Sequence, residues 1–257
     1  MFSLKNKTAI VTGGGSGIGK SIAIIFARQG AHICILDMDS TGSDHVANQI
    51  TENGGTASVH ICNIADQETV KTVVAEILTA NGKIDILINN AGVAHIGNIE
   101  NTDTTDMDRL FSINVKGAYN CMQTVIPTMK QGGGVIINLA SVAATLGISD
   151  RFAYSMTKGA VLSMTMSVAK DYIGYGIRCN SISPGRVHTP FVDGFIAKNY
   201  PGKEAEMFDK LSKTQPIGRM GQPDEIAYLA LYLCSEEAAF ITGCDYPIDG
   251  GFTKLNS

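Results

Sequence analysis

The stretch Thr12-Gly13-Gly14-Gly15-Ser16-Gly17-Ile18-Gly19 follows directly on the apolar run 8–11, and residues 20–29 after it have the periodicity of a helix. A glycine-rich turn between a strand and a helix lets the backbone approach a pyrophosphate and directs free N–H groups of the helix N-terminus toward it. The turn therefore predicts a dinucleotide site. Its contacts would come from Gly13, Gly15, Ser16, Gly17, Ile18 and Gly19.

Apolar runs of strand length alternate with helical stretches along the whole chain. The expected strands are 8–12, 32–36, 57–60, 85–88, 135–139, 177–182 and 245–248. The expected helices are 17–29, 42–53, 66–81, 103–130, 153–174, 204–213 and 223–234. Continuous apolar runs are typical of parallel strands buried on both faces, and no proline- or serine-rich linker divides the chain. The pattern predicts an α/β protein with one domain over residues 1–257, a Rossmann fold whose doubly wound, seven-stranded parallel sheet has helices on both faces.

The composition excludes several classes of protein. Of 257 residues, 44% are apolar, which is enough for a full core, and 20 Lys+Arg against 24 Asp+Glu give a net charge of −4. Without a basic face the chain is not expected to bind nucleic acid. No apolar run approaches the roughly 18 residues of a membrane span, so we expect no membrane contact and a cytoplasmic location.

The cysteines argue against a metal site. Six are scattered through the chain with no CxxC pair, so neither a zinc site nor a disulfide scaffold is indicated. Reduced, mostly buried thiols are expected, and no metal is assigned.

Asp37 ends the second apolar run, about 18 residues beyond Gly19. A carboxylate at this place hydrogen-bonds the adenosine ribose and repels a 2′-phosphate. Neither Lys nor Arg lies within the glycine turn or immediately after Asp37, so the charge pattern favours NAD over NADP. The alternative is that Asp37 caps the second helix.

Tyr154 and Lys158 are four residues apart in a helical stretch and so share one face. A cation beside a phenol lowers its pKa toward the range of a general acid or base. Such a pair is often only a solvated surface pair, but Ser141 ends the preceding strand at the edge where parallel sheets bind ligands. Ser141 could donate to a substrate oxygen.

Together these features resemble the short-chain dehydrogenase/reductase family over essentially the whole chain. The motifs that carry the resemblance are Thr12 to Gly19, Asn89-Asn90-Ala91-Gly92, Asn114, Ser141, Tyr154 with Lys158, Pro184-Gly185 and Asp249-Gly250-Gly251. The resemblance implies hydride transfer between a nicotinamide and a carbinol or carbonyl carbon, without a metal.

The resemblance also implies a role for each matching residue. Ser141 would polarise the reacting oxygen, Tyr154 would exchange the proton, Lys158 would lower the Tyr154 pKa and bind the nicotinamide ribose, and Asn114 would hold a water that links the lysine to solvent. Asn89 would brace the central strands. Further cofactor contacts would come from Asn63, Ile64, Asn90, Ala91, Gly92, Pro184, Gly185, Val187 and Thr189.

One position departs from the family pattern. The family usually has an aspartate after the third strand to bind adenine N6, whereas this chain has Asn63. The carbonyl oxygen of an asparagine side chain can still accept that hydrogen bond.

Three features give hints about the substrate. Arg151 lies three residues before Tyr154, where its guanidinium could bind a carboxylate in a bidentate way. His95 and Arg186 are further candidates for substrate contacts. The surrounding sequence is similar to a subgroup acting on hydroxy acids and sugar acids. Arg151 could instead pair with Asp150 or Asp171, and His95 and His188 could be ordinary loop or core histidines.

Residues 186–218 form a long connection interrupted by proline and glycine, which in this family closes over substrate as a lid. Phe191, Phe195 and Ile196 are expected to face the pocket.

Apolar residues on several sides of 103–130 and 153–174 indicate an interface, and the resemblance implies a homotetramer. The leading hypothesis is an NAD-dependent dehydrogenase of a hydroxy or (deoxy) sugar acid. Alternatives are a 3-oxoacyl thioester reductase, a neutral sugar dehydrogenase and a non-catalytic dinucleotide-binding module.

Overall fold

The computed structural model describes residues 1–255 and contains seven parallel strands in one sheet, in the order β3-β2-β1-β4-β5-β6-β7. The strands are β1 Thr8–Thr12, β2 His32–Asp37, β3 Thr56–Ile61, β4 Ile86–Asn89, β5 Gly134–Leu139, β6 Ile177–Pro184 and β7 Asp245–Ile248. The chain moves outward from β1 to β3 and then returns to the other side at β4. The carboxyl ends of β1 and β4 therefore form the switch point at which such sheets bind ligands.

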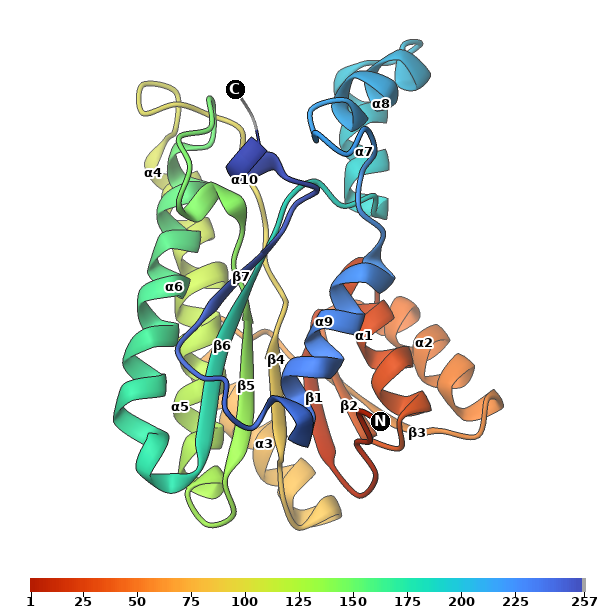
Figure 1. Ribbon diagram of the computed structural model, residues 1–257, viewed down its shortest axis with the longest axis vertical. Coiled ribbons are helices and arrows are strands. Elements are labelled where there is room, and N and C mark those ends of the chain that lie inside the picture. Colours follow the sequence, from red (N-terminus) through yellow and green to blue (C-terminus); the bar gives the residue numbers. More distant parts are fainter. Residues whose placement is uncertain (256–257) are drawn as a thin grey trace.

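Helices cover both faces of the sheet, as expected for buried parallel strands (Figure 1). They are α1 Gly17–Arg28, α2 Ser40–Glu52, α3 Gln67–Asn81, α4 Thr104–Leu110, α5 Gly117–Met129, α6 Phe152–Tyr172, α7 Pro190–Asn199, α8 Glu204–Ser212, α9 Pro223–Cys234 and α10 Phe252–Leu255. One core packs α1, α2 and α9 on the sheet. The second packs α3, α5 and α6 on the opposite face. The predicted fold class is confirmed over the described residues.

Helices α7 and α8 rise from the carboxyl edge of the sheet, apart from both helical layers (Figure 1). Their mutual contact includes Ile196, which is buried and lines a cavity of about 350 Å³ with Asp193, Glu204, Ala205 and Phe208. Two of the residues expected to face the substrate pocket can be placed here. Ile196 lies between α7 and α8, and Phe191 is 64% exposed.

The helix expected over 103–130 is interrupted. Residues Phe111–Lys116 form a π-helical segment between α4 and α5. Neither proline nor glycine marks the start of this segment in the sequence, so periodicity alone could not reveal it. A π-helical turn widens the backbone and frequently occurs at functional sites. Here it carries Asn114.

Neither a metal site nor a membrane span is found among residues 1–255. No cluster of three or more His, Cys, Asp or Glu in that range could hold a metal ion. No helix there has the length and apolarity that crossing a bilayer requires.

Candidate active site

The glycine turn after β1 has the geometry that the sequence predicts. Gly13 and Gly17 have φ of 65° and 53°, in the left-handed region that favours glycine. A Cβ at Gly13 would lie 2.9 Å from Cα of Ala91, and one at Gly19 would lie 2.1 Å from the Gly13 carbonyl oxygen. Ser16, the N-cap of α1, makes no side-chain capping bond, and the first turn of α1 holds no acidic residue. The turn therefore presents bare backbone and uncapped helix N–H groups, which fit a pyrophosphate.

The end of β4 fixes this turn in place. The Asn90 side-chain amide donates to the carbonyl oxygens of Thr12 (3.0 Å) and Gly13 (3.1 Å). In return, the Thr12 hydroxyl accepts from the backbone N–H groups of Asn90 and Ala91, both at 3.0 Å. Thr12 is a positioning residue that the sequence analysis did not single out. Its signal is a hydroxyl at the last position of an otherwise apolar strand. Asn89 donates to Asn138 at 2.8 Å and so braces β4 against β5.

Asp37 turns toward the glycine turn rather than toward the second helix. Its Oδ2 accepts from the Gly15 backbone N–H (3.0 Å), and its Oδ1 accepts from that of Asp39 (3.1 Å). The N-cap of α2 is Asp39, so the alternative that Asp37 caps this helix is wrong. The buried Ser43 hydroxyl has no hydrogen-bond partner among the described residues and lies 2.9 Å from where a Gly15 Cβ would be. This polar recess beside a carboxylate fits a ribose.

Asn63 and Ile64 follow β3 at the same edge. The Asn63 side-chain oxygen accepts from the Ala65 N–H at 3.1 Å, and the residue is exposed. Ile64 is buried, and its carbonyl oxygen accepts from the Asn120 side chain at 2.8 Å. Asn63 thus has an oxygen at the expected place, already used in a local turn, and its bond to adenine stays a prediction.

Asn114 connects the loop after β4 to the helix that carries Tyr154. Its side-chain oxygen accepts from the Val93 N–H (2.8 Å), and its amide donates to the Val93 carbonyl oxygen (2.9 Å) and to the Thr157 hydroxyl (3.0 Å). The Thr157 hydroxyl donates in turn to the Tyr154 carbonyl oxygen at 2.8 Å. Thr157 is a second positioning residue that the sequence analysis missed, although it stands directly before Lys158.

Tyr154, Lys158 and Ser141 come together at the carboxyl ends of the central strands. Lys158 is 6% exposed, lies 5.9 Å from the Tyr154 ring centre, and donates from Nζ to the Leu139 carbonyl oxygen at 2.7 Å. Burial lowers the pKa of Lys158 to about 8. Burial also raises the pKa of Tyr154, whereas hydrogen bonding to Ser141 and the Arg151 charge lower it. A direct effect of Lys158 on that pKa stays a prediction.

Gly92 keeps space open beside the lysine. A Cβ at this position would lie 3.1 Å from the Asn114 side-chain oxygen and 3.5 Å from Lys158 Nζ. The backbone there needs no left-handed conformation, so the constraint concerns space and not strain. Gly92, Asn114 and Lys158 thus lie close together, and their roles toward the cofactor stay predictions.

The segment after β6 lies opposite the glycine turn. Gly185 N–H donates to the Ile248 carbonyl oxygen at 3.0 Å, and Val187 is buried. Thr189 is the N-cap of α7 and makes no side-chain capping bond. Its methyl group lies 3.5 Å from where a Gly17 Cβ would be. The structure thus brings the two ends of the expected dinucleotide site face to face.

Arg151 lies within electrostatic reach of Tyr154, and Arg186 lies within electrostatic reach of Arg151. Arg151 donates to the backbone oxygen of Asp150 at 2.8 Å and makes no ion pair among the described residues, so the alternative pairings with Asp150 and Asp171 are not formed. Arg186 has a buried Nε without a partner in the same part of the chain. Burial and then the Arg151 charge lower the pKa of Arg186, so the two positive charges act on each other.

The histidines near the site have acidic neighbours. His95 Nδ1 lies 3.4 Å from the Asp106 carboxylate, while its Nε2 is buried and has no partner among residues 1–255. His188 Nε2 lies 2.9 Å from Asp193, and its ring packs edge-on against Phe208 at 4.9 Å. His188 therefore joins the base of α7 to α8, whereas His95 is placed in the loop that pairs with Arg151 through Gly97.

Comparison with known proteins agrees with this arrangement. The profile of the family described as enoyl-(acyl carrier protein) reductase matches residues 13–253. The crystal structure of a short-chain dehydrogenase/reductase from Burkholderia xenovorans superposes with a TM-score of 0.94 at 32% identity, covering 99% of both chains. The chain belongs to the short-chain dehydrogenase/reductase family. Members bind a nicotinamide cofactor, and this chain is an oxidoreductase of alcohol or ketone substrates.

Two relatives within the family differ in substrate. The 2-keto-3-deoxy-L-fuconate dehydrogenase of Xanthomonas campestris is 36% identical over 253 residues, which are 98% of this chain and 81% of that protein. L-sorbose reductase from Gluconobacter frateurii, solved with NADPH and L-sorbose, superposes with a TM-score of 0.94 at 30% identity, covering 99% of each chain. One relative is thus named for an acid and the other for a neutral sugar.

Proposed function

We propose that this oxidoreductase is NAD-dependent and acts on the secondary alcohol or ketone of a hydroxy acid or (deoxy) sugar acid. The observation that carries the proposal is the pair Arg151 and Arg186, two guanidinium groups whose charges act on each other, Arg151 also acting on Tyr154, without a carboxylate partner from the described chain. Two unpaired cations in a partly buried site favour an anionic ligand, because a carboxylate would relieve their repulsion.

The catalytic residues are assigned from the geometry around Tyr154. Tyr154 exchanges a proton with the reacting oxygen, and Ser141, which hydrogen-bonds the phenol, holds that oxygen. Lys158 and Asn114, on either side of the Gly92 gap, provide the polar path that returns the proton. When bound, the nicotinamide supplies the hydride chemistry. Its pyrophosphate would be held by Gly13, Gly15, Ser16, Gly17, Ile18 and Gly19.

NAD rather than NADP is proposed from Asp37. Its carboxylate lies against the glycine turn with only backbone N–H donors as partners, so a 2′-phosphate there would meet a negative charge. Asn63, Ile64, Asn90, Ala91 and Gly92 would line the adenosine side. Pro184, Gly185, Val187 and Thr189 would contact the nicotinamide side.

The α7–α8 segment is proposed to close over the substrate as a lid, with the exposed Phe191 facing the pocket and His95 beside it. Limited proteolysis tests this, since NADH should slow cleavage within 186–218. Equal cleavage with and without NADH would contradict the lid.

The six free thiols, five of them buried, fit a reducing cytoplasm.

The proposed substrate class is tested by following nicotinamide absorbance with paired compounds. Each hydroxy acid or sugar acid is compared with its own methyl ester, with NAD(H) and NADP(H) in parallel. We expect kcat/KM for the acid to exceed that for the ester by about 10- to 100-fold, the effect of hydrogen bonds to a charged group. Equal turnover of acid and ester, or turnover only of neutral sugars, would refute carboxylate recognition.

A 3-oxoacyl thioester reductase is the second candidate. The description of the matching family profile favours it, since that profile is named for an acyl-carrier-protein substrate. The NAD-type Asp37 and the absence of an obvious basic cluster in the sequence for docking a carrier protein oppose it. A 3-oxoacyl thioester in the same substrate panel decides between the two.

A further inference from the structure

The lid segment leaves the body of the protein and returns to it at one narrow place. After β6 the chain passes through Arg186 and His188 into α7 and α8, and it returns at Gly221 before α9. Two backbone hydrogen bonds close this excursion. Gly221 N–H donates to the Arg186 carbonyl oxygen, and His188 N–H donates to that of Gly221, both at 2.9 Å. We call residues 185–189 and 219–222 the neck.

The outgoing strand of the neck is held from both sides. On one side Gly185 N–H donates to the Ile248 carbonyl oxygen at the end of β7. On the other side Val187 is bridged to Gly221. The end of β7 is paired with β6 in the sheet, so the position of Val187 and Thr189 depends on how firmly Gly221 is placed.

Arg219 and Glu225 flank Gly221 and form a two-pronged ion pair across it. Arg219 Nη1 and Nη2 each donate to a separate Glu225 oxygen at 2.8 Å. Glu225 Oε2 also accepts from the Gln222 N–H at 2.8 Å, and Arg219 donates to the Met220 carbonyl oxygen at 3.1 Å. The Glu225 oxygen lies 3.7 Å from where a Gly221 Cβ would be. The pair therefore holds the residues on both sides of Gly221, Met220 and Gln222, by hydrogen bonds.

The pair has more bonds than an ordinary surface ion pair. Isolated exposed pairs contribute little, but a bidentate arginine–carboxylate pair with further hydrogen bonds is geometrically specific. The Arg219 hydrogen bonds and the Gln222 N–H lower the pKa of Glu225 to about 2. The pair thus stays charged throughout the physiological range.

We propose that Arg219 and Glu225 are positioning residues that hold Val187 and Thr189 for the nicotinamide half of the cofactor. This inference rests on the proposed function only in assigning residues 184–189 to the nicotinamide. The adenosine half is assigned to the turns after β1, β2, β3 and β4, and none of the hydrogen bonds of the Arg219–Glu225 pair reaches these turns. Loss of the pair should therefore weaken one half of the binding site and spare the other.

The experiment compares two ligands on the full-length chain by calorimetry, NADH and ADP, since ADP lacks the nicotinamide ribosyl group. Glu225→Gln keeps an oxygen that can accept from the Gln222 N–H but removes the negative charge. Arg219→Lys keeps the positive charge but cannot form the bidentate hydrogen bonds to Glu225. We expect the NADH dissociation constant to rise about tenfold in Glu225→Gln, the scale of coupling through such networks, with ADP changed less than about twofold. Arg219→Lys should fall between wild type and Glu225→Gln.

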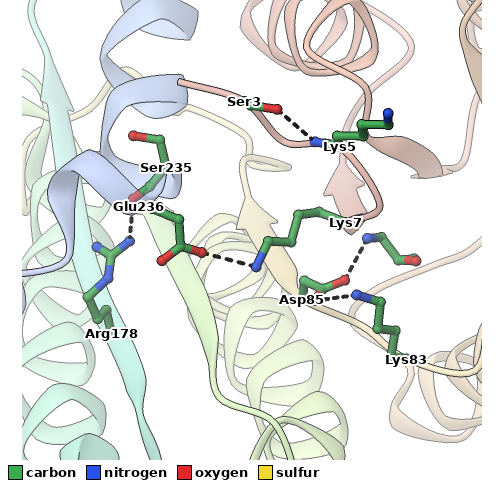
Figure 2. A network of polar contacts seen from close by, with 9 residues as sticks. Ser3, Lys5, Lys7, Lys83, Asp85, Arg178, Ser235 and Glu236 are labelled. Carbon is green, nitrogen blue, oxygen red and sulfur yellow. Dashed lines mark hydrogen bonds and ion pairs between the residues drawn. The ribbon is translucent and has the colours of Figure 1, made fainter. Parts of the chain in front are cut away.

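The matched control lies at the other end of the same helix. Glu236 follows α9 and pairs with Lys7 at 3.2 Å (Figure 2). Glu236→Gln removes an exposed carboxylate far from the neck, and it should leave both dissociation constants unchanged.

A second measurement needs no variant. Amide hydrogen exchange at His188 and Gly221 in the wild-type protein should slow when NADH is added and stay unchanged with ADP, because only NADH has a nicotinamide half that contacts the neck. Equal weakening of NADH and ADP in the variants would mean a purely structural role, and an unchanged NADH affinity would mean no role; each overturns the inference. A wild-type chain that binds ADP but not NADH would instead refute the proposed function.

Discussion

The buried ammonium of Lys158 should make the ligand-free protein less stable than it would be with an apolar residue in its place. Lys158 is 6% exposed, and its only hydrogen bond to the described chain goes to the Leu139 carbonyl oxygen. No carboxylate balances it there. Replacing it in a Lys158→Met variant keeps an unbranched side chain and removes the charge.

The sign and size of the effect follow from the pKa. Burial lowers the pKa of Lys158 from 10.5 to about 8, which corresponds to about 3 kcal/mol of unfavourable free energy for the charged form in the folded state. Below pH 8 both the folded and the unfolded chain hold the proton, so this cost is constant. Between pH 8 and 10.5 only the unfolded chain holds it, so the lysine's contribution to folding stability rises with pH.

Urea unfolding of wild type and Lys158→Met, measured from about pH 7 to about pH 10, isolates this contribution as the difference between the two proteins. We expect the variant to have the higher free energy of unfolding at neutral pH, and the difference to shrink by about 2 kcal/mol between pH 8 and pH 10. Lys71→Met, at the exposed surface of α3, is the matched control, because it removes a lysine that is not buried. A difference for Lys158→Met that does not change with pH would refute the reasoning.

Three further variants test the site. Tyr154→Phe should bind NADH normally and lose about a thousandfold in turnover; substantial residual turnover in the absorbance assay would exclude Tyr154 as the proton donor. Asp37→Ala should lower the ratio of kcat/KM for NAD over NADP by about tenfold or more, and an unchanged ratio would refute the charge argument. Arg151→Met should raise KM for the acid substrate about 10- to 100-fold without affecting its methyl ester, whereas equal effects on both would make Arg151 structural.

Assembly is tested separately. Phe111, Tyr119 and Met166 are about half exposed on the helical layer formed by α5 and α6, which supports the proposed homotetramer. Met166→Lys should lower the mass measured by light scattering. Met38→Lys, at an exposed apolar position on another face, should not. A wild-type mass of one chain would refute the assembly.

The sheet could be predicted from the sequence because its strands are buried on both faces. Each of β1, β2, β4 and β5 is a nearly continuous apolar run, and the observed bounds differ from the predicted ones by one residue at most at each end. The π-helical segment at Asn114 could not be predicted in this way. Its Asn114 makes hydrogen bonds to Val93 and Thr157, which are far apart in the sequence and meet only after folding.

The candidate site also has features that the local sequence predicts and features that depend on tertiary contacts. The residue types of Asp37, Ser141, Tyr154 and Lys158 are visible in the sequence because each stands at a strand end or on a helix face. Which groups partner them is not visible. The pairing of Asp37 with Gly15, the contact of Lys158 with Leu139 and the absence of an acid partner for Arg151 within the described residues all depend on tertiary distances.

A buried polar network lies beside Tyr154, outside both apolar cores. Asn114, Thr157 and Lys158 are each under 7% exposed, and they lie among residues that bind one another rather than in either apolar core. Burying polar groups costs free energy unless every donor and acceptor is paired. Asn114 and Thr157 meet that condition through Val93 and Tyr154, whereas Lys158 keeps a charge with a single carbonyl partner. The one unbalanced charge in this network therefore belongs to Lys158, the residue beside the proton-exchanging Tyr154. A destabilising charge that is kept at this place indicates selection for chemistry rather than for stability.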